Sequence, residues 1–277
     1  MEHSVTWFSY LPGARELEAY LRHAQEGALG KSGGLLFGSP VVVQHVLASI
    51  LVCLVIFLVS LSLKRSLKQQ GEGALIPLPK VTLQNLIETA LEYLYLQMHS
   101  IIGKEASRYF PVISALALFI FFSNALGLIP GFTPPTDNWN TTLACGLFVF
   151  LYYNAHGLRA HGLGHIAHMA NPAGTWWGWF LAPLLFPIEL VSHIARPASL
   201  AIRLAANMVG DHAVVTAFLG LVPILVPLPF MALGLMVCVV QTLVFVLLTT
   251  VYISLSVSGD DEHAKVHTSQ TEEPVHS

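Results

Sequence analysis

Apolar residues run in long, nearly uninterrupted stretches along most of this chain. Five stretches reach or approach the roughly 20 residues that a membrane-crossing helix needs, and they cover residues 41–63, 110–130, 141–158, 176–219 and 222–257. An unpaired backbone group is costly in lipid, and no stretch alternates as a barrel strand does. The pattern predicts an all-α integral membrane protein with five membrane-crossing helices, of which the last two are long and antiparallel.

The segment 81–103 has a different, amphipathic pattern. Apolar residues recur at helical spacing among glutamine, glutamate and histidine; they are Leu83, Leu86, Leu91, Leu94 and Ile101. This spacing predicts a helix that lies at the cytoplasmic membrane interface without crossing it. An ordinary amphipathic helix packed on the bundle fits the same pattern.

The composition agrees with a membrane protein. The chain is 54% hydrophobic and 10% charged, with a mean hydropathy of +0.64, which lies outside the usual range of soluble domains. Cys53, Cys145 and Cys238 fall inside apolar stretches and lack metal-ligand spacing, so we interpret them as packing residues. We expect the lipid bilayer as surroundings, no cofactor, no bound metal and no nucleic-acid partner.

The basic residues predict how the chain is oriented. Lys64, Arg65, Lys68 and Lys80 follow the first stretch, Arg159 follows the third, and the loop 131–140 has no Lys or Arg. The positive-inside rule then places the N-terminus, 131–140 and 220–229 outside, and 64–109, 159–175 and the C-terminus inside. We therefore expect an outer segment 1–40, a membrane domain 41–257 and a cytoplasmic tail 258–277, whose polar composition predicts disorder.

Two arginines, Arg196 and Arg203, fall inside a membrane stretch. A charge at the bilayer centre costs at least about 2.5 kcal/mol, so we expect Arg203 to be a buried cation with a function. At about 100° per helical residue, five polar residues lie within about 40° of Arg203; they are Glu189, Ser192, Arg196, Ser199 and Asn207. We call these six residues the polar stripe. It predicts contact with a neighbouring helix, another subunit or a water-filled cavity, and Pro197 predicts a kink beside it.

Ionisable residues occur on both sides of Arg203 along the helix. Glu189 lies roughly 21 Å towards the cytoplasm, and Asp211 and His212 lie roughly 12–14 Å towards the outside. A fixed cation between them repels a passing ion, which favours two aqueous half-channels for H⁺ or Na⁺ over one open pore. Gln241 on the last, antiparallel helix is expected to reach the level of Arg203. The structural alternative is a permanent pair of Arg203 with Glu189 or Asp211.

Several segments of the sequence resemble a known protein family. SLAIRLAANMVGDH (199–212) is similar to the hallmark of the a subunit of F-type ATP synthases in bacteria. FSNALGLIPGFTPPT (122–136), GLRAHGLGHIAH (157–168) and QTLVFVLLTTVYI (241–253) agree with it, so the resemblance covers about residues 80–256.

The resemblance implies a role for the site residues. Arg203 would face the ion-binding carboxylate of a rotor ring of c subunits, release its ion and block leakage between the half-channels. Asn207 and Gln241 would lie beside Arg203, Glu189 on the cytoplasmic path and His212 on the outer path. Gly234 stands where some relatives carry an ionisable group, so the outer route would here depend on His212, Asp211 and water.

The same resemblance implies surroundings and partners. These are b-type peripheral stalk subunits, the remainder of the ATP synthase complex and the bacterial plasma (inner) membrane. The chain would carry no catalytic chemistry of its own.

Two other functions fit parts of the residue pattern. An i, i+4 pair, which is a metal-ligand spacing, occurs among four neighbouring histidines, namely His156, His161, His165 and His168. Histidines that face solvent fit the same pattern. A metalloprotease would need an HExxH pattern, and the sequence has none. The stronger rival is a secondary transporter that uses Arg203 and Glu189 to bind substrate. Such folds usually contain internal repeats, and we find none in this sequence.

Overall fold

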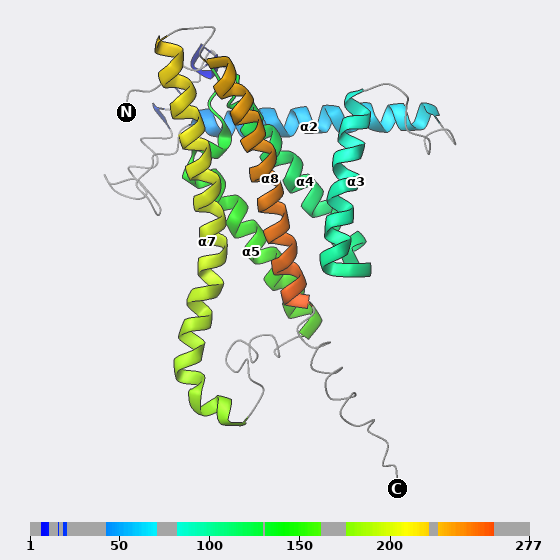
Figure 1. The fold of residues 1–277 in the computed structure, drawn as a ribbon, viewed down its shortest axis with the longest axis vertical. Coiled ribbons are helices and arrows are strands. Elements are labelled where there is room, and N and C mark those ends of the chain that lie inside the picture. Colours follow the sequence, from blue (N-terminus) through cyan, green and yellow to red (C-terminus); the bar gives the residue numbers. More distant parts are fainter. Residues whose placement is uncertain are drawn as a thin grey trace.

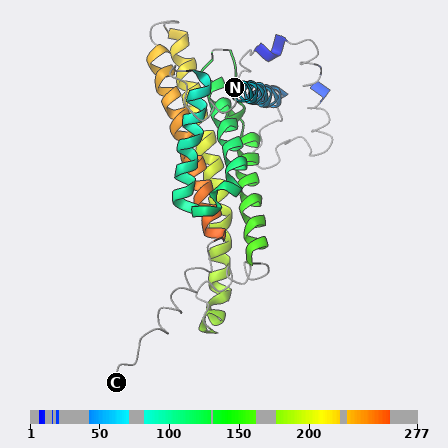
Figure 2. The same cartoon turned by 90° about the vertical axis from the view of Figure 1, so that its right-hand side faces the viewer.

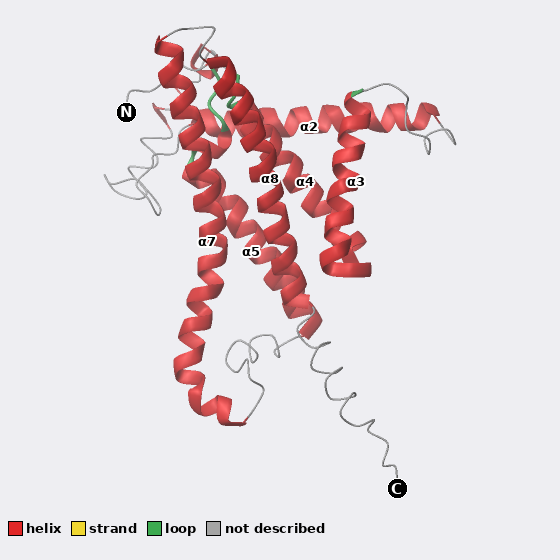
Figure 3. Cartoon of the chain, in the orientation of Figure 1, coloured by secondary structure: helices red, strands yellow, loops and turns green. Residues whose placement is uncertain are grey.

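The computed structural model describes residues 7–10, 16, 19–20, 43–70, 82–129, 131–161, 176–221 and 227–257, and this part is helical without strands (Figure 3). Its long helices are α2 (Val43–Gln70), α3 (Leu83–Ile102), α4 (Ala106–Leu126), α5 (Trp139–His161), α7 (Trp176–Leu221) and α8 (Pro227–Val257). Short 3-10 turns are η1 (Trp7–Tyr10), η3 (Gly103–Glu105) and η4 (Pro135–Asp137). A helix is confirmed for each of the five apolar stretches and for 81–103. The segment 1–40 lies largely outside the described residues and the tail 258–277 wholly outside them, so both assignments stay predictions.

The helices do not all run in one direction. In Figure 1 α3, α7 and α8 run roughly alongside one another and α4 and α5 slant between them, whereas α2 lies across the bundle. Figure 2 shows α2 nearly end on while the other helices remain upright. The start of α2, η4, the end of α7 and the start of α8 lie at one end of the bundle. The end of α2 and the start of α3 lie at the same height in Figure 1, so the alternation of loops that the basic residues predict stays a prediction.

Three helical runs in the described part are long and apolar enough to cross a membrane: Gln44–Ser66, Gln84–Leu126 and Pro229–Val257. The second run comprises α3, η3 and α4 together. The number of five crossings and their orientation therefore stay predictions. With 46 residues, α7 is about 69 Å long, which is more than twice the roughly 30 Å of hydrocarbon in a bilayer. Such a helix must tilt strongly or extend well beyond the lipid.

One hydrophobic core joins α3, α4, α5, α7 and α8. Its most buried side chains are at most 1% exposed; they are Met98, Ala106, Tyr109, Ile113, Ile120, Val149, Tyr153, Leu200, Leu204, Phe245, Val246 and Ile253. Because α5 packs against both α7 and α8, and α4 against α8, the last two helices are held from one side. The opposite side, which carries Arg203 and Asn207 of α7 and Val240 of α8, is exposed in the described part of the chain.

The amphipathic helix α3 packs against the bundle with one of its faces. Thr82 caps its start by accepting a hydrogen bond from the Asn85 backbone N–H at 3.3 Å, and Gly103, with φ of 74°, turns the chain into α4. Ile87, Leu94 and Met98 are buried, and α3 contacts α4 and α8. Packing on the bundle is therefore confirmed for this face, and the interfacial placement stays a prediction.

Candidate functional site

The helix α7 has two unlike faces around Arg203. Its inner face is closely packed: Leu200, Ala201, Leu204, Ala205 and Met208 are each at most 3% exposed. Arg203 lies on the opposite side, and its side chain is exposed in the isolated chain. The expected burial of Arg203 is therefore not met within this chain, because apolar side chains already fill the face that α5 covers. Of the three surroundings that we predicted for the polar stripe, a second subunit or water remains for Arg203.

A hydrogen bond links the polar stripe to α8. The Asn207 side-chain amide donates to the Gln241 Oε1 atom at 2.6 Å. Gln241 is only 4% exposed, whereas Asn207 is exposed. Asn207 lies one helical turn beyond Arg203, so Gln241 is placed close to the level that the sequence predicted for it. Its Nε2 atom is buried and has no hydrogen-bond partner in the described part of the chain.

An open cavity of about 440 Å³ lies next to this hydrogen bond, between α7 and α8. Its lining comes from both helices: Ala206, Asn207, Gly210, Asp211, Met236, Val237, Val240 and Gln241. Three of these residues are polar, and the cavity is large enough to hold several water molecules. Asp211 thus lines the same cavity as the Asn207–Gln241 pair.

The part of the polar stripe that precedes Arg203 in the chain has other contacts. The Arg196 guanidinium carbon lies 5.8 Å from the centre of the Tyr252 ring on α8, which is a cation–π distance. The Ser192 hydroxyl donates to the Ile188 carbonyl at 2.9 Å, and Ser199 is exposed. The structure therefore brings Arg196 to α8 and leaves Ser199 and Arg203 facing outwards.

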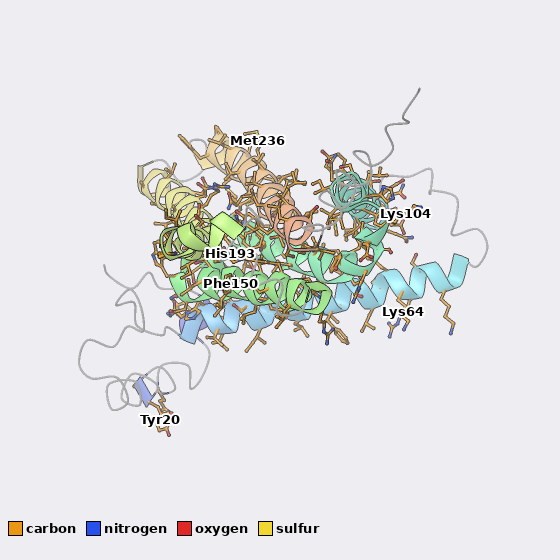
Figure 4. The ribbon with its side chains drawn as sticks, turned by 90° about the horizontal axis from the view of Figure 1, so that it is seen from below. Tyr20, Lys64, Lys104, Phe150, His193 and Met236 are labelled. Carbon is orange, nitrogen blue, oxygen red and sulfur yellow. The ribbon has the colours of Figure 1, made fainter. Side chains whose placement is uncertain are left out.

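His193 lies on the inner face, away from the stripe. It is 8% exposed, and its ring centre lies 6.4 Å from that of Phe150 and 5.8 Å from that of Tyr153, both on α5. Figure 4 shows His193 and Phe150 next to each other, with Met236 on the far side of α8. The ring contacts make His193 a packing partner of α5.

Two predicted site residues cannot be placed in detail. The backbone of Glu189 and of His212 is helical, but their side chains lie outside the part that the structure describes. Asp211 and Arg203 are both described, and no ion pair joins them. The alternative of a permanent Arg203–Asp211 pair is therefore not observed in this chain.

The histidine group is mostly outside the described side chains. His156 packs against Tyr109 and Tyr152, with ring centres at 5.0 Å and 4.6 Å. The side chain of His161, and residues His165 and His168, are not described. Within the described residues, no three His, Cys, Asp or Glu side chains are grouped so that they could hold a metal ion.

Sequence reasoning missed two contacts that shape the site. One is the contact between Arg196 and the Tyr252 ring. An aromatic residue in an apolar helix does not by itself indicate that a cation lies against it. The other is a buried hydrogen bond from the Thr136 hydroxyl to the Asn124 side-chain oxygen at 2.7 Å. Both residues lie in the segment 122–136 that carried the resemblance, and two buried polar residues 12 positions apart were the available signal.

The arrangement supplies a fixed cation, a neutral amide pair and a carboxylate along one open face. Amide groups can donate and accept hydrogen bonds, and a carboxylate can bind and release a proton or coordinate Na⁺. A nucleophile paired with a base is not part of the described site. The described groups can hold or relay an ion.

Comparisons with known proteins agree on one family. The family model of the ATP synthase A chain matches residues 46–254. The chain is 44% identical to ATP synthase subunit a of Sorangium cellulosum over 214 residues, which are 77% of this chain and 82% of that protein. It is also 44% identical to ATP synthase subunit a of Bdellovibrio bacteriovorus over 192 residues, or 69% of this chain and 82% of the relative. ATP synthase subunit a 1 of Syntrophotalea carbinolica is 44% identical over 76% of this chain and 84% of its own length.

Proposed function

Because this chain belongs to the ATP synthase A chain family, we propose that it is the ion-conducting stator subunit of the membrane sector. Two offset half-channels pass H⁺ or Na⁺ to and from a carboxylate on a rotor ring of c subunits. Arg203 separates the half-channels, so that ion flow is coupled to rotation and to ATP synthesis. The observation that carries this proposal is the exposed Arg203 on α7, one helical turn before a cavity whose lining includes Asn207, Asp211 and Gln241.

An exposed cation at this position requires a partner. A charged side chain in the middle of a bilayer costs at least about 2.5 kcal/mol, so an Arg203 that faced lipid would be strongly disfavoured. A carboxylate presented by a neighbouring subunit offsets this cost by charge pairing. Attraction to the arginine also lowers the affinity of that carboxylate for its proton, which favours ion release.

The cavity between α7 and α8 supplies the outer half-channel. Asn207, Gln241 and Asp211 line it, and His212 follows directly in the chain. Water in this space would connect Asp211 to the Asn207–Gln241 pair and hence to the neighbourhood of Arg203. The inner half-channel would run past Glu189, Ser192, Arg196 and Ser199.

The partners follow from the same proposal. The rotor ring covers the open side of α7 and α8, b-type peripheral stalk subunits hold the chain still, and the bacterial plasma (inner) membrane surrounds it. No catalytic chemistry is assigned to this chain, because bond-breaking takes place elsewhere in the ATP synthase complex.

The rival function is a secondary transporter, which would need no ring. The test compares proteoliposomes that contain the whole membrane sector with proteoliposomes that contain this chain assembled without c subunits. Proton and sodium flux under an imposed membrane potential is followed with ion-sensitive dyes. We expect flux only when the ring is present. Equal flux from the chain alone would support the transporter and contradict the stator.

A further inference from the structure

A glycine of α5 allows the backbone of α7 to come unusually close just before Arg203. A Cβ atom placed on Gly146 would lie 2.9 Å from the Pro197 carbonyl oxygen and 3.3 Å from the Ala201 Cβ atom. The nearer of these atoms belongs to the backbone, so it cannot rotate away as a side chain can. Any residue other than glycine at position 146 would therefore push α5 and α7 apart.

A second glycine meets the same face of α7 just after Arg203. A Cβ atom on Gly127, at the end of α4, would lie 2.6 Å from the Met208 Cε atom and 2.8 Å from the Pro134 Cγ atom. The Met208 Cε atom is the end of a flexible side chain, so this contact is more easily relieved than the backbone contact at Gly146. Ala201 is two residues before Arg203 and Met208 is five residues after it. The two close contacts therefore bracket the arginine along α7.

The bracketed segment is one in which α7 needs external support. Pro197 has no backbone N–H, so the His193 carbonyl lacks its normal helical hydrogen bond and the helix can bend there. Bending or rotation at Pro197 would move everything beyond it, including Arg203. The inner residues Ala201 and Met208 lie about 140–160° around the helix from Arg203, so contacts on that side fix the direction in which the arginine points.

The occurrence of glycine in the middle of α5 supports this interpretation. Glycine in a helix is less stable than alanine by roughly 0.5–1 kcal/mol, so without a steric reason Gly146→Ala would stabilise the helix. We infer that Gly146, together with Gly127, is a positioning residue that sets the bend and rotation of α7 and so holds Arg203 towards the rotor. This inference rests on the proposed function of Arg203.

The experiment replaces Gly146 by Ala in the complete ATP synthase complex. Ala144→Val is the matched control, because Ala144 is exposed on the same turn of α5. Two quantities are measured: ATP-driven proton pumping in proteoliposomes, and the distance between spin labels at Leu151 on α5 and Ile202 on α7, both of which are exposed. The labels are attached to cysteines after Cys53, Cys145 and Cys238 are replaced by Ala, and pumping in that background is the reference.

We expect Gly146→Ala to lower pumping about tenfold and to change the label distance by on the order of 1 Å, because small misplacements of a reacting group are costly. Ala144→Val should change neither quantity. Normal pumping with an unchanged distance would overturn the inference, and so would lost pumping without a change in distance.

A milder variant covers the case in which Gly146→Ala does not assemble. Ala201→Ser adds one atom on the α7 side of the same contact, and its hydroxyl can bond to the Pro197 carbonyl. Ala201→Ser should change the label distance in the same direction as Gly146→Ala and should lower pumping in part. A label distance and a pumping rate that both equal the wild-type values would overturn the inference. The proposed function is judged separately: pumping that survives Arg203→Ala removes it, whereas a null result at Gly146 removes only the positioning role.

Discussion

At the scale of single residues, the pair formed by Asn207 and Gln241 is the best-defined part of the site. Gln241 is almost fully buried on α8, yet its amide oxygen accepts a hydrogen bond from the exposed Asn207 on α7 at 2.6 Å. This bond connects the helix that carries Arg203 to its antiparallel neighbour. It fixes the relative rotation of the two helices one turn beyond the arginine and keeps an amide group beside the cavity.

We predict that Asn207 and Gln241 act as a unit. Asn207→Leu and Gln241→Leu should each lower ATP-driven pumping several-fold, and the double variant should lower it no further, because either change removes the same bond. Interhelical hydrogen bonds in membranes contribute about 0.6 kcal/mol on average, so stability should change little. The measurement is the rate of vesicle acidification in all three variants.

Thr249→Val is the control for this pair. The Thr249 hydroxyl is also buried on α8 but donates to the Phe245 carbonyl of its own helix at 2.8 Å. Loss of the Thr249 hydroxyl should leave the rate of vesicle acidification unchanged. Fully additive effects of the two leucine substitutions would contradict a joint role.

The residue pattern predicted which side chains share a face but not which neighbour covers them. Helical spacing placed Ser199, Arg203 and Asn207 together, and all three are exposed on the open side of α7. The close approach at Gly146 could not be predicted, because a glycine in an apolar helix gives no information about its contact. Hydropathy likewise marked Arg203 as costly in lipid without showing that it lies on the outside of this chain.

At the scale of elements, one buried side-chain hydrogen bond attaches the connection between α4 and α5 to α4. The Thr136 hydroxyl of η4 donates to the Asn124 side-chain oxygen of α4, and the two residues are 0% and 2% exposed. The same loop contacts α7 near Met208, because Gly127 leaves room there. The loop thereby supports the part of the site that follows Arg203 in α7.

Removal of this bond should destabilise the connection. Thr136→Val keeps the shape of the side chain but leaves the buried Asn124 oxygen without a donor. We expect the free energy of unfolding to fall by about 1–3 kcal/mol. The measurement is the midpoint of thermal inactivation of the purified complex. Ser114→Ala is the comparison, since the Ser114 hydroxyl makes only an exposed bond to the Pro111 carbonyl of its own helix at 3.1 Å. Equal midpoints in the two variants would contradict the assigned role of Thr136.

The existence of each helix was predictable from its apolar run, but its bounds only in part, because polar residues can continue a helix past that run. The helix α2 ends at Gln70, seven residues beyond the predicted 41–63, and α4 begins at Ala106, four residues before the predicted 110–130. The predicted stretch 176–219 corresponds to α7 at Trp176–Leu221, and 81–103 corresponds to α3 at Leu83–Ile102. The direction of each helix was not predictable, since periodicity defines a face and not a tilt. Only packing against other helices sets that direction.

At the scale of the whole molecule, the crosswise placement of α2 affects how deep each residue of α7 lies in the membrane. If α2 stands along the membrane normal, α7 and α8 must lie strongly tilted, which also accommodates the 46 residues of α7. The roughly 21 Å between Glu189 and Arg203 is then a distance along the helix, and the separation in depth is smaller. In that orientation the polar stripe of α7 runs sideways across the membrane, so the two half-channels that we propose would open at different places along the helix.

The central claim is that Arg203 is the barrier between the two half-channels, and one substitution tests it most directly. Arg203→Ala is compared with Arg108→Ala in the complete complex, because Arg108 is an exposed arginine whose pair with Glu105, at 4.0 Å, contributes little. ATP-driven acidification of vesicles is measured beside ATP hydrolysis by the detached catalytic head. We predict that Arg203→Ala abolishes acidification while hydrolysis continues and Arg108→Ala behaves as the parent. Coupled pumping that persists in Arg203→Ala would contradict the account.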